Sequence, residues 1–370
     1  MSEVARAALW VLLVLAAFFA ADALLFRTGW YNALLEPDSS AGQLESHLYW
    51  LENARPPRAP QVLVVGDSRI AEGFSPRLAN TVVEQRLYFW NFGVAGTSPR
   101  TWYYALRAAD PTHRRFAAIV LALDHYSDED GPGNLEDRLI DRNYLVMRLG
   151  LRDCLPFAWS MNSMAGRQQT LAGCLLRGIV LRTDVQALLE KPAGRVDHAR
   201  DWLENGLNYT TNYGGKTESL AGLTVDWSHR TIRFPEGVSE RVRAEVRSSL
   251  LPDPPSPEDA GSLARYRRRW LGGILDLYSG SSTQVIFLQL PRGPAKRPGG
   301  DVIEGYVEAA SRRPGAHLFP ADTFVDLERP ELFADGLHLN RTGRPEFTTR
   351  IAGRVDAIIR NPANKISEAH

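Results

Sequence analysis

The stretch Val62-Leu63-Val64-Val65-Gly66-Asp67-Ser68-Arg69-Ile70 decides how the rest of the chain is interpreted. Its first four residues form a continuous aliphatic run, which is typical of a strand buried on both faces of a parallel sheet. Gly66 lets the chain turn sharply where the strand ends, and ligands of open α/β sheets bind at that edge. Ser68 is therefore a candidate nucleophile, although Gly-Asp-Ser is also an ordinary turn sequence.

Further apolar runs along the chain repeat a rhythm of strand, loop and helix. The pairs Ser75-Pro76 and Ser98-Pro99 each read as a serine cap with proline in the first helical turn. The expected strands cover residues 62–65, 87–92, 117–123, 285–290 and, as a short edge strand, 318–325. This rhythm predicts an α/β fold with a doubly wound parallel sheet and right-handed crossovers.

A nearly unbroken apolar run extends from Ala7 to Phe26, interrupted only by Asp22 near its end. Twenty helical residues span about 30 Å, the thickness of the hydrocarbon core of a bilayer. The run predicts an uncleaved membrane anchor over residues 1–27. A cleaved signal peptide is the alternative, because Ala21, Asp22 and Ala23 put small residues around a possible cleavage site. A short tail before the anchor and a large domain after it favour export of the bulk of the chain.

Proline-rich stretches and changes in the apolar pattern divide the remaining chain into segments. Residues 28–60 are rich in proline at both ends and predict a linker that contains a short helix near Glu45 to Asn53. The α/β domain is expected to comprise residues 61–127 and 254–362. Between its two parts, residues 128–253 lose the strand rhythm and predict a large, mostly helical insertion. This insertion either shapes a substrate site over one end of the sheet or is a purely structural extension.

The bulk composition excludes some classes of function. Lys plus Arg and Asp plus Glu both number 43, so the chain shows no basic footprint for nucleic acid. The eight histidines never pair at ligand spacing, and no metal or other cofactor is predicted. Cys154 and Cys174 are either a disulfide, if the domain is extracytoplasmic, or two separate buried thiols.

Asp335 and His338 stand three residues apart in a glycine-containing loop just before the last predicted helix. That spacing lets the aspartate contact one imidazole nitrogen while the other points outward, as a general base requires. Alone the pair is also compatible with a surface turn. In a doubly wound sheet, however, the first strand is central and this loop can fold back over its carboxyl end, which would bring His338 to Ser68.

Three blocks of this chain resemble signature blocks of the SGNH/GDSL hydrolase superfamily. They are Gly66-Asp67-Ser68, the loop Asn91-Phe-Gly93-Val-Ala-Gly96, and Asp335-Gly-Leu-His338, in the order and strand context of the family. The resemblance covers residues 61–127 and 283–360. It implies a flavodoxin-like, three-layer α/β/α domain with a parallel sheet.

The resemblance also implies roles. Ser68 would be the nucleophile, His338 the base and Asp335 the acid that orients it. The backbone N–H groups of Ser68 and Gly96 would donate to the oxyanion. Asn91 and Arg69 are candidate substrate contacts, with an ordinary salt bridge as the alternative role for Arg69. Asp67 is expected to serve the turn.

One block departs from the family pattern. Where the family has Gly-x-Asn-Asp after the third strand, this chain has Asp124-His125-Tyr126-Ser127. The missing asparagine is an oxyanion donor, and the loss of one such donor costs on the order of 10²–10³ in rate. Tyr126 or His125 is a candidate substitute and a candidate substrate contact. A further alternative makes His125 a base paired with Asp124.

An anchor, a linker and an SGNH-like domain together resemble exported proteins that esterify cell-envelope polymers, such as the D-alanyl transfer proteins of teichoic acid assembly. The layout implies a single-pass protein of the inner (cytoplasmic) membrane with a periplasmic catalytic domain. Its expected partners are a polysaccharide or other glycan acceptor and a multispanning membrane acyltransferase. The predicted activity is O-acyl transfer, most simply of acetyl, through an acyl-serine. Alternatives are an exported carbohydrate esterase and a non-catalytic glycan-binding component.

Overall fold

A computed structural model describes residues 2–55, 58–128, 135–252, 261–298 and 305–361. The chain divides into two compact units, each made of two segments. The helical unit comprises Met1–Asn53 and Glu136–Leu207, and the α/β unit comprises Ala54–Leu135 and Asn208–His370. The predicted insertion 128–253 is therefore not one body, because its first part joins the amino-terminal residues and its last part joins the sheet.

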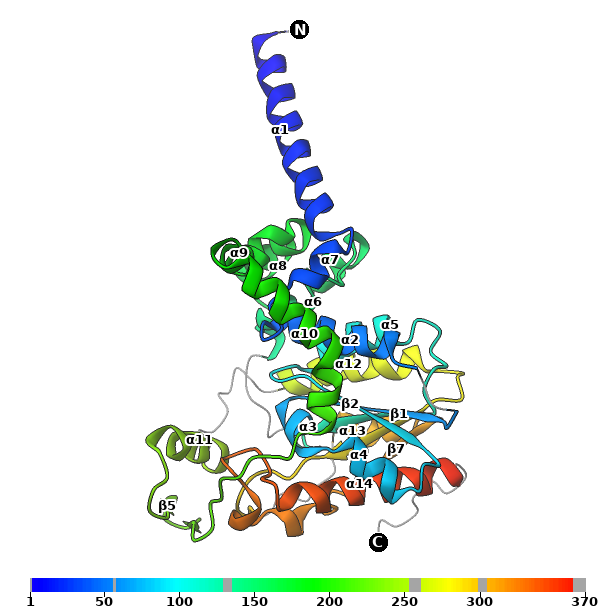
Figure 1. The fold of residues 1–370 in the computed structure, drawn as a ribbon, viewed down its shortest axis with the longest axis vertical. Coiled ribbons are helices and arrows are strands. Elements are labelled where there is room, and N and C mark those ends of the chain that lie inside the picture. The colour runs from blue at the N-terminus through cyan, green and yellow to red at the C-terminus, as the bar shows by residue number, and fades with distance from the viewer. Residues whose placement is uncertain (1, 56–57, 129–134, 253–260, 299–304, 362–370) are drawn as a thin grey trace. The chain divides into compact units, whose positions relative to one another are not determined.

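The α/β unit is built on a five-stranded sheet in the order β2-β1-β3-β6-β7 (Figure 1). Every pairing in it is parallel, which confirms the predicted α/β class. Its strands are β1 (Gln61–Gly66), β2 (Tyr88–Gly93), β3 (Ala118–Leu123), β6 (Gln284–Gln289) and β7 (Ala316–Leu318). Gly66 and Gly93 are register partners at the carboxyl ends of β1 and β2. The two loops that follow these strands consequently start side by side.

Helices cover both faces of this sheet, with α4 and α14 on one side and α5 and α12 on the other (Figure 1). Val62 and Val64 of β1 belong to one core cluster with Phe347 and Ile351 of α14. The alternate β1 residue Leu63 is also fully buried. Burial on both faces explains why the strand reads as a continuous aliphatic run rather than an alternating one.

Two helices of the α/β unit, α4 and α5, begin at the serine–proline pairs that predicted them. Ser75 caps α4 and Ser98 precedes α5, each with proline in the first turn. The unit contains α3 (Ser68–Gly73), α4 (Pro76–Val82), α5 (Pro99–Ala109), α11 (Glu240–Leu250), α12 (Ser262–Leu277), α13 (Tyr306–Ser311) and α14 (Gly343–Arg360). It also holds the hairpin β4 (Thr224–Asp226) and β5 (Thr231–Arg233), and the 3₁₀ turns η4 (Val325–Leu327) and η5 (Pro330–Leu332).

The predicted edge strand 318–325 was misplaced. The observed strand β7 ends at Leu318, and residues 320–327 form turns. Phe319 still donates its N–H to the carbonyl of Phe287 at 2.9 Å. Pro320 has no N–H and cannot continue the ladder, so the apolar residues that follow are buried in a turn instead.

The helical unit joins the start of the chain to its middle. It contains α1 (Glu3–Phe26), η1 (Trp30–Leu34), α2 (Ser40–Asn53), α6 (Ile140–Leu145), α7 (Leu151–Ala158), α8 (Met164–Leu175), α9 (Arg177–Glu190) and most of α10 (Pro192–Thr211), with η2 (Leu135–Asp137) at its boundary. Residues 28–53 were predicted as part of a linker, but α2 buries Leu44, Leu48 and Leu51 in this unit. Cys154 and Cys174 form a disulfide between α7 and α8.

Helix α1 is long and apolar enough to cross a membrane, and its carboxyl end is part of the folded unit. Asp22 is 6% exposed and accepts hydrogen bonds from the backbone N–H groups of Arg177 (3.0 Å) and Gly178 (2.7 Å) at the start of α9. Phe26 is buried in a cluster with Tyr31 and Leu181. A cleavage next to Asp22 would remove a capping group of this unit, which favours the predicted uncleaved helix over the signal-peptide alternative.

Candidate active site

Ser68 is the first residue of α3, and one residue, Asp67, separates it from the end of β1. Asp67 caps this helix, accepting the N–H of Arg69 at 2.9 Å on its side chain, as a residue of the turn should. The space beside α3 is narrow, because a Cβ on Gly93 would lie 2.2 Å from the backbone nitrogen of Ala71. The glycine at the end of β2 thus lets α3 pack directly on the sheet edge and fixes where Ser68 lies.

The loop that carries Asp335 and His338 is closed by its own backbone. Phe333 and Leu339 form an antiparallel bridge, and the N–H of Ala334 donates to the carbonyl of His338 at 2.9 Å. Asp335 Oδ1 accepts the backbone N–H of His338, also at 2.9 Å. This tight turn holds the carboxylate and the imidazole on the same side of the loop.

Ser68, His338 and Asp335 form a continuous hydrogen-bonded relay. His338 Nε2 lies 2.8 Å from Ser68 Oγ, and His338 Nδ1 lies 2.9 Å from both carboxylate oxygens of Asp335. When the carboxylate accepts the Nδ1 proton, Nε2 is left as the acceptor for the serine hydroxyl. The three residues predicted from opposite ends of the α/β unit are therefore brought together in the geometry of a nucleophile, a base and an orienting acid.

The electrostatics of the loop favour an ionised Asp335. Burial acts to raise its pKa, but hydrogen bonds from the His338 ring and from the N–H groups of Leu337 and His338 outweigh burial and hold the pKa below the ordinary carboxyl range. A charged Asp335 stabilises an imidazolium at His338, which is the state formed when the serine proton is taken up.

Lys216 is a site residue that the sequence did not reveal. Its ammonium lies 3.0 Å from Asp335 Oδ2 and 2.9 Å from Glu72 Oε2 of α3. Burial acts to lower the pKa of Lys216, but the bonds to Glu72 and Asp335 outweigh it and raise the pKa. A lysine that shares the orienting carboxylate with the histidine can tune how strongly that carboxylate favours the imidazolium.

Backbone pairing holds Lys216 in place. Its carbonyl accepts the N–H of Arg341 at 2.8 Å, and it forms a parallel bridge with Asn340. Gly215 before it has φ +89° and passes 3.1 Å from the Arg341 Cα at the position where a Cβ would stand. Residues 215–216 thus lie against the chain that follows His338. Only the pair Gly214-Gly215 hinted at a close backbone approach in the sequence.

Two predicted substrate contacts are used within the protein instead. Asn91 Nδ2 donates to the carbonyls of Ile70 (2.9 Å), Ala71 (3.3 Å) and Phe74 (3.0 Å), while its Oδ1 accepts the N–H of Gly93 (2.8 Å). Because both ends of the amide bind backbone, Asn91 stabilises the end of α3 and thereby the placement of Ser68.

Arg69 has the salt-bridge role that was its alternative. It pairs with Asp67 at 2.6 Å and with Asp124 at the end of β3. Burial acts to raise the pKa of Asp67, but the ion pair with Arg69 outweighs it and lowers the pKa. The Asp124 carboxylate, which the alternative mechanism assigned to His125, is thus paired with Arg69.

The two residues proposed to replace the missing oxyanion donor both make contacts within the protein. Tyr126 is fully buried, and its hydroxyl lies 3.1 Å from the carbonyl oxygen of Phe287 and 3.0 Å from that of Phe319. His125 Nδ1 lies 3.1 Å from the carbonyl oxygen of Ser127. Arg267 donates to the carbonyls of His125 (2.5 Å), Tyr126 (3.0 Å) and Ser127 (2.6 Å), which clamps this loop on α12.

Gly96, the other predicted oxyanion donor, lies in the turn after β2. Its φ is +72°, a left-handed conformation that suits glycine, and the residue is exposed. The N–H of Val94 and the hydroxyl of Thr97 both donate to the carbonyl of Gly66, at 3.0 and 3.1 Å. The turn that contains Gly96 is therefore bonded to the end of the strand that precedes Ser68.

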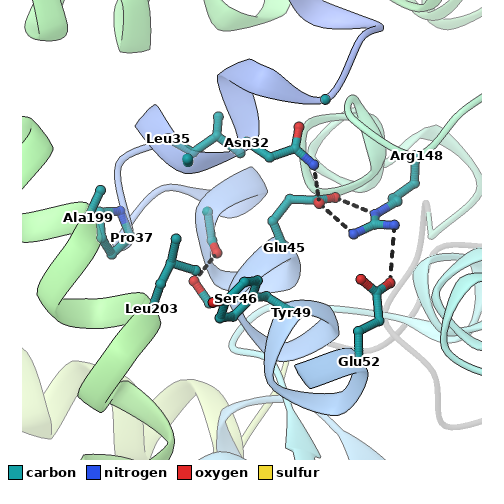
Figure 2. A pocket seen from close by; sticks show the side chains of 13 residues that line it. Asn32, Leu35, Pro37, Glu45, Ser46, Tyr49, Glu52, Arg148, Ala199 and Leu203 are labelled. Carbon is teal, nitrogen blue, oxygen red and sulfur yellow. Dashed lines mark hydrogen bonds and ion pairs between the residues drawn. The ribbon is translucent and has the colours of Figure 1, made fainter. Parts of the chain in front are cut away.

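The cavities in the described parts of the chain include one in each unit. One, of about 520 Å³, is lined by residues between 216 and 242 and by Ala334 and Asp335, but by neither Ser68 nor His338. The other, of about 240 Å³, lies in the helical unit, where Glu45 accepts two hydrogen bonds from Arg148 (2.8 and 2.7 Å) and one from Asn32 (2.9 Å; Figure 2). Burial raises the pKa of Glu45, and Arg148 offsets this only in part. Ser46, which also lines the smaller cavity, donates its hydroxyl to the carbonyl of Gly42 at 2.7 Å.

Among the described residues, one group has carboxylate and imidazole atoms close enough to share a cation. The ligand atoms of Glu36, Asp38 and His198 lie within 4.8 Å of one another. Glu36 is already paired with Arg195 at 2.7 Å and with His198 at 3.1 Å. An ion-pair network accounts for this group.

A scan against protein-family models and a search of curated proteins found no match to the chain. The SGNH/GDSL resemblance is therefore carried by the short residue blocks alone and stays a prediction.

Proposed function

We propose that the protein is a membrane-anchored serine acyltransferase of SGNH type that modifies an exported polysaccharide. The observation that carries this proposal is the relay from Ser68 Oγ through His338 to Asp335, with distances of 2.8 and 2.9 Å. A serine hydroxyl is a weak nucleophile until an adjacent base removes its proton, and this relay supplies that base.

The proposed reaction has two balanced steps. Ser68 Oγ attacks the carbonyl carbon of an acyl donor while its proton passes to His338 Nε2, and the resulting oxyanion faces the N–H groups of Ser68 and Gly96. The donor's leaving group takes the proton from His338, which leaves an acyl-Ser68 ester. A sugar hydroxyl then attacks this ester and gives its proton to His338. Collapse releases the acylated sugar, and the proton returns to Ser68.

The fold supports the family part of the proposal. Counted among its own strands, the sheet has the order 2-1-3-4-5, which is the order of flavodoxin-like sheets. Ser68 follows β1, an inner strand between β2 and β3, at the carboxyl edge where ligands of such sheets bind. The finer assignment, to a three-layer SGNH domain, belongs to the proposal.

The cellular part of the proposal rests on the helical unit. Helix α1 is long and apolar enough to cross a membrane, and the Cys154–Cys174 disulfide is typical of an oxidising compartment. We infer a single-pass protein of the inner (cytoplasmic) membrane with its bulk in the periplasm. The acyl donor would then be a multispanning membrane acyltransferase that passes the group across the bilayer.

The acceptor proposal is supported by the cavity of about 520 Å³ beside Lys216 and Asp335. Polar residues, among them Glu218, Ser219, Glu236 and Ser239, line it together with apolar residues such as Leu220 and Val238. Hydroxyl and carboxylate groups of this kind suit the hydroxyls of a sugar chain better than they suit an apolar ligand.

The test uses the full-length protein in detergent with an activated acetyl ester, with and without oligosaccharide. Acetylated oligosaccharide that disappears in Ser68→Ala supports the transferase. Release of acetate with no acetylated sugar assigns the protein to the exported carbohydrate esterases. Absence of any covalent acyl group on Ser68 contradicts both enzymes and favours a non-catalytic glycan-binding component. An exposed serine at the opposite edge of the sheet provides the matched control, Ser282→Ala.

A further inference from the structure

The helical unit leaves a set of large apolar side chains exposed on α7, on α9 and along α8. Their exposed fractions range from 38% to 64%. They are Leu151, Leu155, Trp159, Met164, Leu175 and Ile179, which we call the apolar face. Single exposed apolar residues are ordinary, but several on three helices that pack in succession, α7 on α8 and α8 on α9, indicate an interaction surface.

Helical spacing and one covalent link gather these residues. Leu151, Leu155 and Trp159 follow each other at intervals of four along α7, so they share one side of that helix. Met164 and Leu175 are separated by about three turns of α8 and also share a side. The disulfide joins the neighbours of Leu155 and Leu175, because it links Cys154 to Cys174.

The end of α8 and the start of α9, which carry Leu175 and Ile179, are bonded to the base of α1. Arg27, directly after α1, donates to the carbonyls of Cys174 (2.5 Å) and Leu175 (3.1 Å). Asp22 caps the start of α9, within two residues of Ile179. Figure 1 shows α7, α8 and α9 grouped beside the end of α1. The carboxyl end of α1 is part of this unit, so a bilayer crossed by α1 would end beside the end of α8 and the start of α9.

The charges around the apolar face select the kind of surface it meets. Residues 151–182 contain Arg152 and Arg182, which are exposed, and Arg167, which is half-buried, while Arg177 is buried; the acidic residue in this range is Asp153. The Arg167 guanidinium lies 6.0 Å from the centre of the Trp159 ring. Tryptophan beside arginine is typical of the headgroup layer, where the ring is half in hydrocarbon and the cation meets phosphate. Juxtamembrane arginines that outnumber the acidic residues favour anionic lipid.

We propose that the apolar face binds the headgroup layer of an anionic phospholipid bilayer around the base of α1. The helical unit is then attached to the membrane through α1 and also binds the membrane surface through Leu155, Trp159 and Ile179. This inference rests on the proposed membrane crossing by α1 and is independent of the chemistry proposed for Ser68.

The test places a photo-crosslinking residue in the full-length protein as Leu155→benzoylphenylalanine or Ile179→benzoylphenylalanine. The protein is reconstituted in nanodiscs of phosphatidylglycerol and phosphatidylcholine, irradiated and analysed by mass spectrometry. Leu189→benzoylphenylalanine is the matched control, since Leu189 is 76% exposed on the same helix as Ile179 but about 15 Å further along it. We expect lipid adducts at 155 and 179 in at least about fivefold higher yield than at 189.

Two further arms separate the sources of binding. In discs of phosphatidylcholine alone, and in the variant Arg152→Gln/Arg182→Gln, we expect the adduct yield at 179 to fall at least about twofold. Equal yields at 179 and 189, or no lipid adduct at either 155 or 179, would overturn the proposal. Adducts to another membrane protein in native membranes, in place of lipid, would overturn it too and assign the face to that protein.

Folding and function are scored on the same samples. A peptide map under non-reducing conditions shows whether Cys154–Cys174 is intact, and a variant that lacks the disulfide is replaced by Leu175→benzoylphenylalanine. Acylation of Ser68 is measured in parallel. If lipid adducts form but Ser68 is not acylated, the result contradicts the proposed enzyme and supports the lipid-binding face. The two proposals can therefore fail independently of each other.

Discussion

The two units of this protein differ in how their buried carboxylates are paired and in where their apolar side chains lie. In the α/β unit the strand residues are buried, and a buried carboxylate, Asp335, connects through His338 to a serine hydroxyl at the sheet edge. In the helical unit the buried carboxylate of Glu45 is saturated by Arg148 and Asn32. That unit instead leaves apolar side chains exposed on α7 to α9. The α/β unit thus carries the groups of the proposed proton transfer, and the helical unit carries the proposed membrane-binding face.

The change with the largest expected effect on this comparison removes the serine hydroxyl at the end of the relay. In Ser68→Ala the acyl group has no attacking oxygen, and we expect the rate of acyl transfer from an activated ester to fall by about 10⁴ or more. The measurement is the initial rate of acetyl release or transfer by the full-length protein. Ser282→Ala should retain the wild-type rate. A Ser68→Ala protein that keeps more than a tenth of its activity would contradict the assignment.

A second change tests whether the helical unit has its own stability. The Cys154→Ala/Cys174→Ala variant opens a loop with a sequence separation of 20, and loops of this size contribute about 3 kcal/mol through the entropy of the unfolded chain. We expect amide exchange in α7 and α8 to accelerate by about 100-fold, with the exchange of β1 and β3 unchanged. Equal acceleration in both units would show that the two unfold as one body.

Lys216 sharpens the comparison of the two buried carboxylates, because it is a second partner of Asp335 beside His338. In Lys216→Met the cation that competes for Asp335 is lost, which favours the imidazolium at His338. We expect the acidic limb of the profile of kcat/KM against pH to move to higher pH, and the rate at neutral pH to fall about tenfold. Lys216→Arg keeps the charge and should keep the profile. A lower rate with an unshifted profile would assign Lys216 a purely structural part.

The smallest expected effect is the contribution of Asp335 to stability in acid. Hydrogen bonds with His338 hold the pKa of Asp335 below its ordinary value of about 3.9. The unfolded chain therefore binds the proton first as the pH falls, and the stabilisation is full above about pH 4 and is lost below it. Free energies of unfolding of the wild type and Asp335→Asn, measured from pH 2 to 6, should converge towards low pH. Parallel curves would contradict the pairing.

Much of the sheet could be predicted because burial on both faces imposes a readable pattern. The strands β1, β2, β3 and β6 each appear in the sequence as an apolar run that ends in a turn. The relay could be predicted because Asp335 and His338 are close in sequence and lie in one loop. Their meeting with Ser68 followed from the topology of a doubly wound sheet, in which carboxyl ends of strands share an edge.

The remaining features depend on contacts that leave no local pattern. Lys216 lies 119 residues from Asp335, and a single lysine in a loop carries no signal of its partner. Tyr126 was a candidate oxyanion donor, but a tyrosine after a buried strand can equally turn its hydroxyl to backbone carbonyls, as it does here. The pairing of residues 136–207 with the first 53 residues was also missed, because helical spacing does not say which helix an apolar side meets.

The cap that Asp22 provides to α9 has a consequence for synthesis. The ribosome makes Asp22 more than 150 residues before Arg177 and Gly178, whose N–H groups it binds. The first strands of the α/β unit emerge in between, and their own completion waits for β6, β7 and the His338 loop. Neither unit can finish folding from a contiguous stretch of nascent chain. Truncation after Asn53 or Leu135 should therefore leave both units incomplete, whereas truncation after Leu207 keeps every residue of the helical unit.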